Sequence, residues 1–226
     1  VTRTAIIENY NLTVTGGNTT SRFTVGGSYF RQDGIVEKSS YDRITFRLNS
    51  DHAIGERIRI GNNFTMSSGN ENKIDEFNTF NGIINAAIKL DPLTPVKDTT
   101  GNFMSSPYTD VKNPVAKLEY TNNLRKRLYI VGNVYADVEL LSGLKFKTDF
   151  GLHLWRRDDY GFDPVYFIAA DEKNEISQVR RNHFKEDQWN WTNTLTYTKE
   201  IGEHNFTLLA GTEAVANRYE TIYAST

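Results

Sequence analysis

Hydrophobic and polar residues alternate with a period of two along most of this chain. The clearest stretches lie at residues 128–140 and 144–154. Successive side chains of a strand point to opposite faces, so this alternation predicts strands with one apolar and one polar face. Six further stretches start at Tyr10, Phe23, Ile44, Ile58, Trp189 and Phe206. Several of the eight predicted strands reach the roughly 9–11 residues that a tilted strand needs to cross a bilayer.

The connections between the predicted strands alternate in length. The short ones are Gly16 to Ser21, Asp51 to Glu56, Leu141 to Gly143 and Lys199 to Glu203. The long ones are Arg31 to Tyr41, Ser67 to Lys126 and Arg156 to His183. Tight turns at one end and long loops at the other are typical of an up-and-down membrane barrel. We therefore expect an all-β fold, an antiparallel transmembrane β-barrel segment.

Charged residues gather on the polar faces of the predicted strands. The opposite faces are nearly free of charged residues, and Asn62 and Asn193 are polar exceptions there. Unpaired charges in a dry core would cost several kcal/mol each, whereas a wet lumen removes that cost. The residues expected to face the lumen are Arg43, Arg47, Arg57, Arg59, Asp137, Glu139, Lys145, Lys147 and Asp149.

Composition narrows the class of protein further. The 226 residues carry a net charge of -2 with a mean hydropathy of -0.54, which argues against a nucleic-acid surface. No run approaches the roughly 18 apolar residues of a transmembrane helix, although a membrane barrel is compatible with this composition. Cysteine is absent, which excludes disulfides and thiolate chemistry. Val1 is not an initiator, and no signal segment opens the chain.

The longest connection contains one predicted helix, Ile74 to Leu90, which Asp91-Pro92 ends. This helix is expected to sit in an external loop. Thr100-Gly101-Asn102 predicts a turn, and Asn113-Pro114 predicts a further turn or short extended piece.

No catalytic, metal or cofactor site is expected. His52, His153, His183 and His204 are scattered, without the spacing of a metal site. The acidic pairs Asp158-Asp159 and Asp171-Glu172 indicate a solvated loop, with a calcium site as the alternative. Glycine patterns for phosphate or dinucleotide binding are missing as well. The chain is therefore not expected to be an enzyme.

Aromatic residues cluster around the predicted loop after residue 155. Aromatic rings stack on sugar faces, so these side chains are candidate substrate contacts. The alternative is an interfacial girdle or loop packing, which aromatics provide in membrane barrels. The candidates are Trp155, Tyr160, Phe162, Tyr166 and Phe167.

Several motifs resemble those of one family, in that family's order along the chain. Tyr10 to Asn18 (YNLTVTGGN) is similar to a barrel strand of the SusC/RagA type of TonB-dependent receptors. Four further pieces resemble other motifs of the same family, among them a loop and a turn: Gln32 to Val36 (QDGIV), Leu93 to Phe103 (LTPVKDTTGNF), Asn113 to Ala116 (NPVA) and Leu141 to Phe146 (LSGLKF). The matching pieces extend from about Asn9 to Gly211.

The resemblance implies an outer-membrane transporter that imports oligosaccharides or peptides, with a SusD-like lid lipoprotein and TonB as partners. It also implies a large barrel of roughly 22 strands around a plug. Residues 1–226 are then an internal part of the barrel domain, without the plug domain and the remaining strands. Ala224 to Thr226 lacks the aromatic end of a closing strand, in keeping with an internal segment.

Two alternatives stay open at this point. The first is a self-contained outer-membrane barrel of eight strands with a structural or adhesion role, since eight strands suffice to close a barrel. The second is a soluble all-β carbohydrate-binding module, which leaves the strict alternation of loop lengths unexplained.

Overall fold

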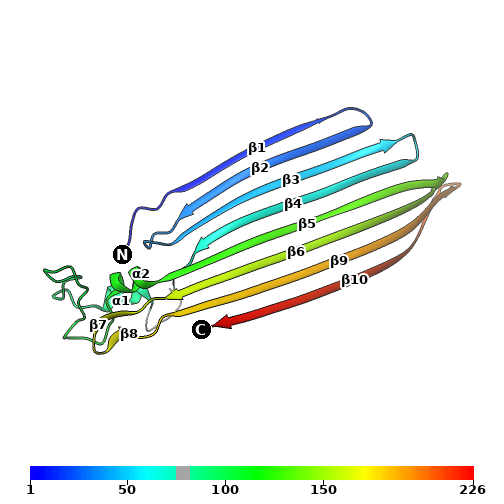
Figure 1. Cartoon of the computed structure of the whole chain (residues 1–226). Coiled ribbons are helices and arrows are strands. Elements are labelled where there is room, and N and C mark those ends of the chain that lie inside the picture. The colour runs from blue at the N-terminus through cyan, green and yellow to red at the C-terminus, as the bar shows by residue number, and fades with distance from the viewer. Residues whose placement is uncertain (75–81) are drawn as a thin grey trace.

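A computed structural model describes residues 1–74 and 82–226 and consists mainly of long strands (Figure 1). The first four strands are β1 (Ile7–Gly17), β2 (Ser21–Asp33), β3 (Ser40–Ile54) and β4 (Ile58–Asn72). After the longest connection come β5 (Asn122–Leu141), β6 (Leu144–Asp163), β9 (Gln178–Ile201) and β10 (His204–Ser225). The described loops add α1 (Ile83–Lys89), α2 (Pro114–Tyr120), β7 (Tyr166–Ala169) and β8 (Glu172–Asn174).

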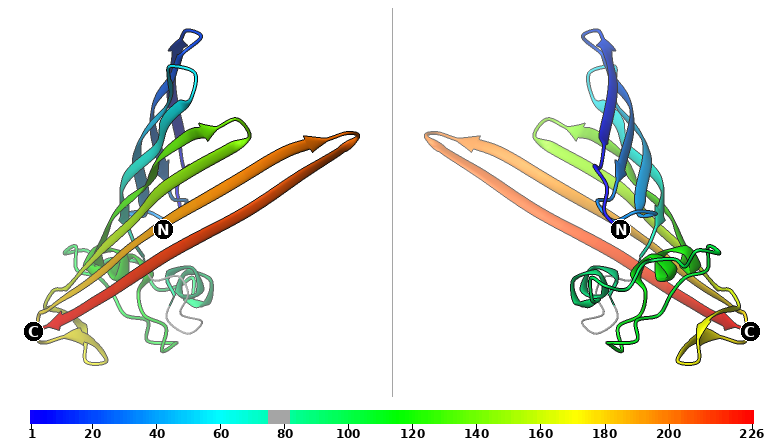
Figure 2. Two further views of the ribbon diagram at one scale, coloured as in Figure 1. Left: turned by 90° about the vertical axis from the view of Figure 1, so that its right-hand side faces the viewer. Right: turned by 90° about the vertical axis from the view of Figure 1, so that its left-hand side faces the viewer.

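The eight long strands form one antiparallel sheet in the order β1-β2-β3-β4-β5-β6-β9-β10. Each strand therefore pairs with its neighbour in the chain, apart from the small β7-β8 hairpin between β6 and β9. The predicted eight strands and all-β class are confirmed. Figure 2 shows that the sheet curves and twists but stays open. Since β1 and β10 form its two edges, a closed eight-stranded barrel is not what this chain forms.

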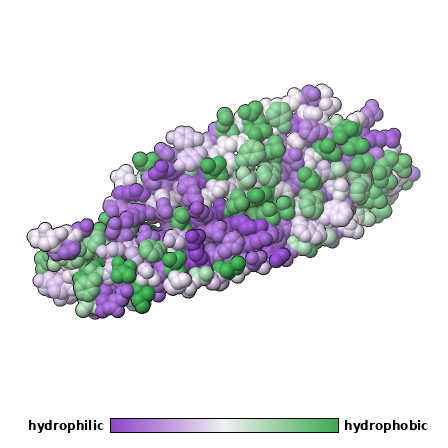
Figure 3. Space-filling model, viewed as in Figure 1, coloured by the Kyte–Doolittle hydropathy of each residue, from purple (hydrophilic) through white to green (hydrophobic). Residues whose placement is uncertain are grey.

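The pairing register separates the residues into two faces, and we call the less polar one the apolar face. Val14, Val25, Leu48 and Phe64 are paired in one row across β1 to β4. Many large hydrophobic side chains on this face are exposed, up to 72% for Leu12. They include Tyr10, Leu12, Val14, Phe23, Ile44, Phe46, Ile58, Ile60, Met66, Leu128, Val134, Phe150, Leu152, Trp189, Trp191, Leu195, Tyr197 and Leu208. Figure 3 shows this hydrophobic surface over the middle of the sheet.

Such a face does not suit a soluble module, because contiguous exposed apolar patches of this extent mark interaction or membrane surfaces. Among the described residues, no helix has the length and apolar character needed to cross a membrane.

Polar residues on the apolar face bond to one another. The Asn62 amide donates a hydrogen bond to Ser50 Oγ on β3 (3.0 Å). Trp191 Nε1 donates to Thr148 Oγ1 (2.9 Å), and Asn193 is paired with Thr148 in the register. The Asn62 and Asn193 exceptions in the sequence pattern therefore lie in small polar groups between paired strands.

The hydrophobic core lies in the loops and not on the sheet. Among the described residues, Val36, Ile83 and Leu118 form the buried cluster, with Val1 and Ile74 packed against it. The helix predicted at Ile74 to Leu90 is present as α1 over its last part, and residues 75–81 lie outside the described residues. The prediction of a turn or extended piece after Asn113 is wrong, because Pro114 begins helix α2.

Several strands extend past their predicted ends. Asp158 and Asp159, predicted in a loop, lie within β6, and the connection after β2 shrinks to residues 34–39. These extensions carry polar residues on both faces, so the alternation that reveals a strand disappears there. Where short turns join the strands the prediction is closer. Ser142-Gly143 links β5 to β6, and Gly143 has a φ of 78°, which favours glycine.

The strands lengthen along the chain, from 11 residues in β1 to 24 in β9. Toward the loops, the first charged residue after the apolar side chains of this face is Arg31 on β2 and Arg156 on β6. Strand β2 ends at Asp33, two residues after Arg31, whereas β6 continues to Asp163, seven residues after Arg156. The loop end of the sheet is therefore stepped, low over β1 to β4 and high over β5 to β10.

Candidate functional site: the polar face of the sheet

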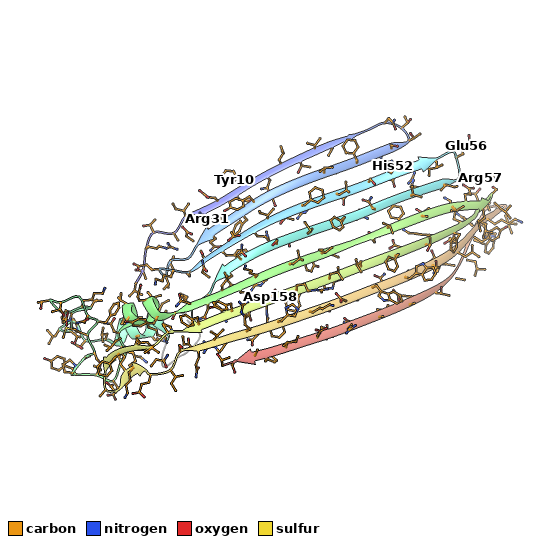
Figure 4. The ribbon with its side chains drawn as sticks, viewed as in Figure 1. Tyr10, Arg31, His52, Glu56, Arg57 and Asp158 are labelled. Atoms are coloured by element: carbon orange, nitrogen blue, oxygen red, sulfur yellow. The ribbon has the colours of Figure 1, made fainter. Side chains whose placement is uncertain are left out.

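The predicted lumen residues gather on the face opposite the apolar one. The register places Arg59 beside Asp137, Asp137 beside Lys147, and Glu139 beside Lys145. Arg43, Arg47 and Asp149 have the same orientation in their strands. Arg57 is different, because it lies in the turn before β4, at the end of the molecule opposite Arg31 (Figure 4). Eight of the nine predicted residues thus share one face, and their role in a lumen stays a prediction.

One hydrogen-bonded group on the polar face spans three strands near the short turns. The Tyr135 hydroxyl of β5 donates to Asp51 Oδ2 of β3 across the intervening β4 (2.7 Å). Gly61 of β4 permits this, since a Cβ there would lie 2.5 Å from the Tyr135 hydroxyl oxygen. Arg59 lies 3.6 Å from the same carboxylate, and Lys147 lies 5.1 Å from the centre of the Tyr135 ring.

A second group joins β4, β5 and β6 near the loops. Arg125 donates to both oxygens of Asp159, with Nη2 3.0 Å from Oδ2. Arg127 donates to Glu71 (2.7 Å), and Arg157 Nε lies 3.4 Å from Asp159 Oδ2. Alternating charges therefore satisfy each other across the strands. A polar passage could be lined in this way without isolated charges.

The five aromatic candidates do not form one surface. Trp155 lies on the polar face, where the Arg157 guanidinium carbon is 5.6 Å from its ring centre. Tyr160 and Phe162 belong to β6 and have the orientation of the apolar face, with Arg181 4.5 Å over the Tyr160 ring. Tyr166 stacks on Tyr120 of α2 (4.4 Å), and Phe167 is 73% exposed. Their part in substrate contact stays a prediction.

Histidines and acidic residues are also placed separately. Among residues 1–74 and 82–226, no group of three or more His, Asp or Glu side chains has the arrangement of a metal site. His183 Nδ1 lies 2.6 Å from Asp158 Oδ1, which makes a pair of neighbours on adjacent strands.

Asn113 organises the loops above the sheet. Its side chain is 1% exposed and accepts hydrogen bonds from the Val115 and Ala116 amides, which caps α2. Its amide nitrogen donates to the Val96 and Met104 carbonyl oxygens, both at 2.9 Å. This one side chain thus joins the start of α2 to two loop segments. The NPVA motif alone does not reveal these contacts.

Glu172 of β8 is buried beside this residue. It is 5% exposed, and its Oε1 accepts from the Asn113 backbone amide (3.0 Å). Its Oε2 has no hydrogen-bond partner among the described residues. Burial raises the pKa of this carboxyl above its ordinary value. The prediction that Glu172 lies in a solvated acidic pair is wrong, because the side chain is buried.

We expect the loop structure around Glu172 to weaken as pH rises. Because the pKa of Glu172 is raised in the folded state, the protonated carboxyl stabilises the folded loop fully at pH values below its ordinary pKa. This stabilisation is lost as the pH rises through the raised pKa. Hydrogen exchange of amides 96–116, corrected for intrinsic rates, should speed up as the pH rises above the ordinary glutamate pKa of 4.5. In Glu172→Gln that acceleration should disappear, because the side chain no longer ionises. An equal acceleration in the variant would rule out Glu172 as its source.

Comparison with known proteins gives a consistent result. No family model matches the chain. It is 31% identical over 215 residues to TonB-dependent receptor P3 of Formosa agariphila and 23% identical over 248 residues to TonB-dependent receptor SusC of Bacteroides thetaiotaomicron. These matches cover 92% and 93% of this chain. Its fold matches a chain of the RagAB peptide transporter with a TM-score of 0.81 at 18% identity.

The matches cover only part of those proteins. The chain spans 21% of P3, 23% of SusC and 26% of the RagAB chain, while the structural match covers 100% of this chain. The ordered motifs, the sequence matches and the shared fold agree. This chain belongs to the TonB-dependent receptors of the SusC/RagA type, with the β-barrel fold of that family.

Proposed function

We propose that residues 1–226 form part of the barrel wall of a TonB-dependent importer in the outer membrane. The supporting observation is the separation of one exposed apolar face from one charged, internally paired face over eight long strands. In a bilayer the apolar face contacts lipid and the polar face lines the lumen. The remaining strands and the plug domain come from the rest of the receptor.

The wider function follows from the family. The named relatives are receptors and a transporter and not enzymes. We propose that the complete receptor imports oligosaccharides or peptides with energy supplied through TonB, under a SusD-like lipoprotein lid. The loops that carry α1, α2 and β7-β8 are at the end expected to face outward, where they can reach such a partner.

Thiol labelling in cells tests the proposed wall, and the absence of cysteine from these 226 residues simplifies it. In the complete receptor, cleared of other cysteines, Gln188→Cys and Thr192→Cys should react with a water-soluble maleimide that reaches the lumen. Trp189→Cys and Leu195→Cys should react only with a lipid-soluble reagent, because their side chains point to the opposite face. Equal labelling of both rows from water would contradict the barrel wall.

Uptake assays test the import function separately. Cells with the receptor should accumulate a labelled oligosaccharide or peptide that receptor-deleted or TonB-deleted cells do not. Accumulation that is independent of TonB would contradict the proposed mechanism. The accepted class of molecule also decides between the two substrates.

A further inference from the structure

We propose that the apolar face carries a binding site for the headgroup of an anionic, phosphate-bearing lipid. The site lies on β5, β6 and β9, where the apolar surface ends toward the loops. We call its four cations, Lys126, Arg156, Arg181 and Lys185, the basic row. The proposal rests on the membrane orientation proposed above and adds a defined ligand to it.

The register brings the basic row together on one face. Arg156 of β6 is paired with Leu128 of β5 and with Lys185 of β9. Lys126 is two residues from Leu128 on β5 and therefore points to the same side. Arg181 has the same orientation on β9 and covers the Tyr160 ring at 4.5 Å.

The height of the row fits the edge of a bilayer. Leu144 is the first apolar residue of β6 on this face after the short turn, and Arg156 follows twelve residues later. At about 3.4 Å per residue and a tilt of about 40°, these residues rise about 31 Å along the membrane normal, which places Arg156 just beyond the apolar band. The apolar band of such barrels is about 25 Å tall. Arg156 therefore lies level with the headgroups.

Positive charge exceeds negative charge in this part of the face. The four cations face three carboxylates on the same side of the sheet, Asp158 of β6, Asp187 of β9 and Glu220 of β10, which is paired with Lys185. Arg218 of β10 adds a fifth cation, 3.8 Å from Glu220. Asp187 is shared, since Arg156 donates to it and Lys185 lies 3.3 Å away. Asp158 contacts His183. Lys126 is opposite Asp158 in the register, but no described carboxylate lies at ion-pair distance from it.

The other half of the sheet differs at the same level. Arg31 on β2 has three acidic neighbours on that face, Glu8, Asp33 and Asp42. An anion would therefore be repelled over β1 to β3 and attracted over β5 to β9. The basic row is a local feature and not a uniform property of the rim.

The position of the row decides which anion it suits. Directly toward the short turns lie Leu128, Leu152 and Trp189, which offer an apolar surface to acyl chains. A ligand that contacts both the apolar surface and the basic row needs a hydrocarbon part toward the short turns and an anionic group toward the loops. Arginine and lysine are the usual partners of phosphate, and basic residues at a membrane surface attract anionic headgroups.

The test uses the complete receptor in detergent and native mass spectrometry. Wild-type receptor should bind phosphatidic acid more tightly than phosphatidylcholine of equal chain length. In Lys126→Gln/Lys185→Gln the affinity for phosphatidic acid should fall about 30-fold, since each basic residue near the surface contributes about fivefold. The matched control Lys145→Gln/Lys147→Gln removes the same charge from the polar face and should bind as wild type.

Three results would overturn the site. These are no preference for phosphatidic acid, an equal loss in the control variant, or displacement of the lipid by inorganic phosphate alone, which would indicate an ion site. If Trp189→Cys still reacts only from lipid, such a result removes the headgroup site and leaves the proposed barrel wall intact. If Trp189→Cys reacts from water, the membrane orientation fails and the site fails with it.

Discussion

Replacing Gly61 by valine is expected to destabilise the sheet by about 2.5–6 kcal/mol. A Cβ at this position would lie 2.5 Å from the Tyr135 hydroxyl and 2.6 Å from the Ser50 carbonyl oxygen. The ring must move, so its hydrogen bond to Asp51 is lost. Overpacking costs about 1–3 kcal/mol, and a hydrogen bond to a charged group contributes about 1.5–3 kcal/mol.

Urea-induced unfolding of the complete receptor in lipid vesicles measures this effect. Gly27→Val is the matched control, because Gly27 lies in β2 with no atom within 4 Å of an added Cβ. It should change the free energy of unfolding little. Tyr135→Phe should be destabilising alone but should add little to Gly61→Val, since both remove the same bond. Full additivity would show that Gly61 does not act through Tyr135.

Replacing Asn113 by alanine is expected to release the loops that carry α1 and α2. The change leaves two carbonyl oxygens and two helix amides without their partner, in a region where the side chain is 1% exposed. A buried group left unsatisfied costs about 1–3 kcal/mol. Even two such losses would raise the population of the open loop by about 30-fold or more. Proteolysis at residues 91–113 in intact cells should speed up by a similar factor.

Two variants define the cause of that change. Asn102→Ala lies in the same loop, but its side-chain partners are the nearby Asp98 and Thr100, so cleavage should rise less than tenfold. Asn113→Asp keeps the acceptor that caps α2 and loses the two donors. It should therefore also open the loop, while α2 amides keep their protection from exchange. Cleavage of Asn113→Ala at the wild-type rate would disprove the organising role.

The strands and their two faces could be predicted from sequence because alternation is a local property. Leu128 to Leu140 shows its faces without reference to any neighbour, and the register then follows from hairpins between consecutive strands. The strand ends could not be predicted in the same way. Around Asp158 and Asp159 both faces are polar, so a strand above the apolar band resembles a loop.

The loops were less predictable, because their structure depends on contacts between distant segments. Asn113-Pro114 fits both a turn and a capped helix with proline at its first position, and burial of Ala116 and Leu118 favours the helix. Glu172 is buried by residues about 60 positions earlier in the chain. The Tyr135–Asp51 hydrogen bond likewise depends on how β3, β4 and β5 are aligned around Gly61. The sequence of a single strand does not show that alignment.

Because the loop end of the sheet is stepped, the two sides of this part of the proposed barrel rise to different heights. Seven residues beyond Arg156 raise β6 by about 18 Å above the headgroups, while two residues beyond Arg31 raise β2 by about 5 Å. In the proposed importer, we expect a long molecule that arrives over the membrane surface to meet a lower rim on the β1 to β4 side than on the β5 to β10 side. Within residues 1–226, the lengths of the strands alone set this difference in height.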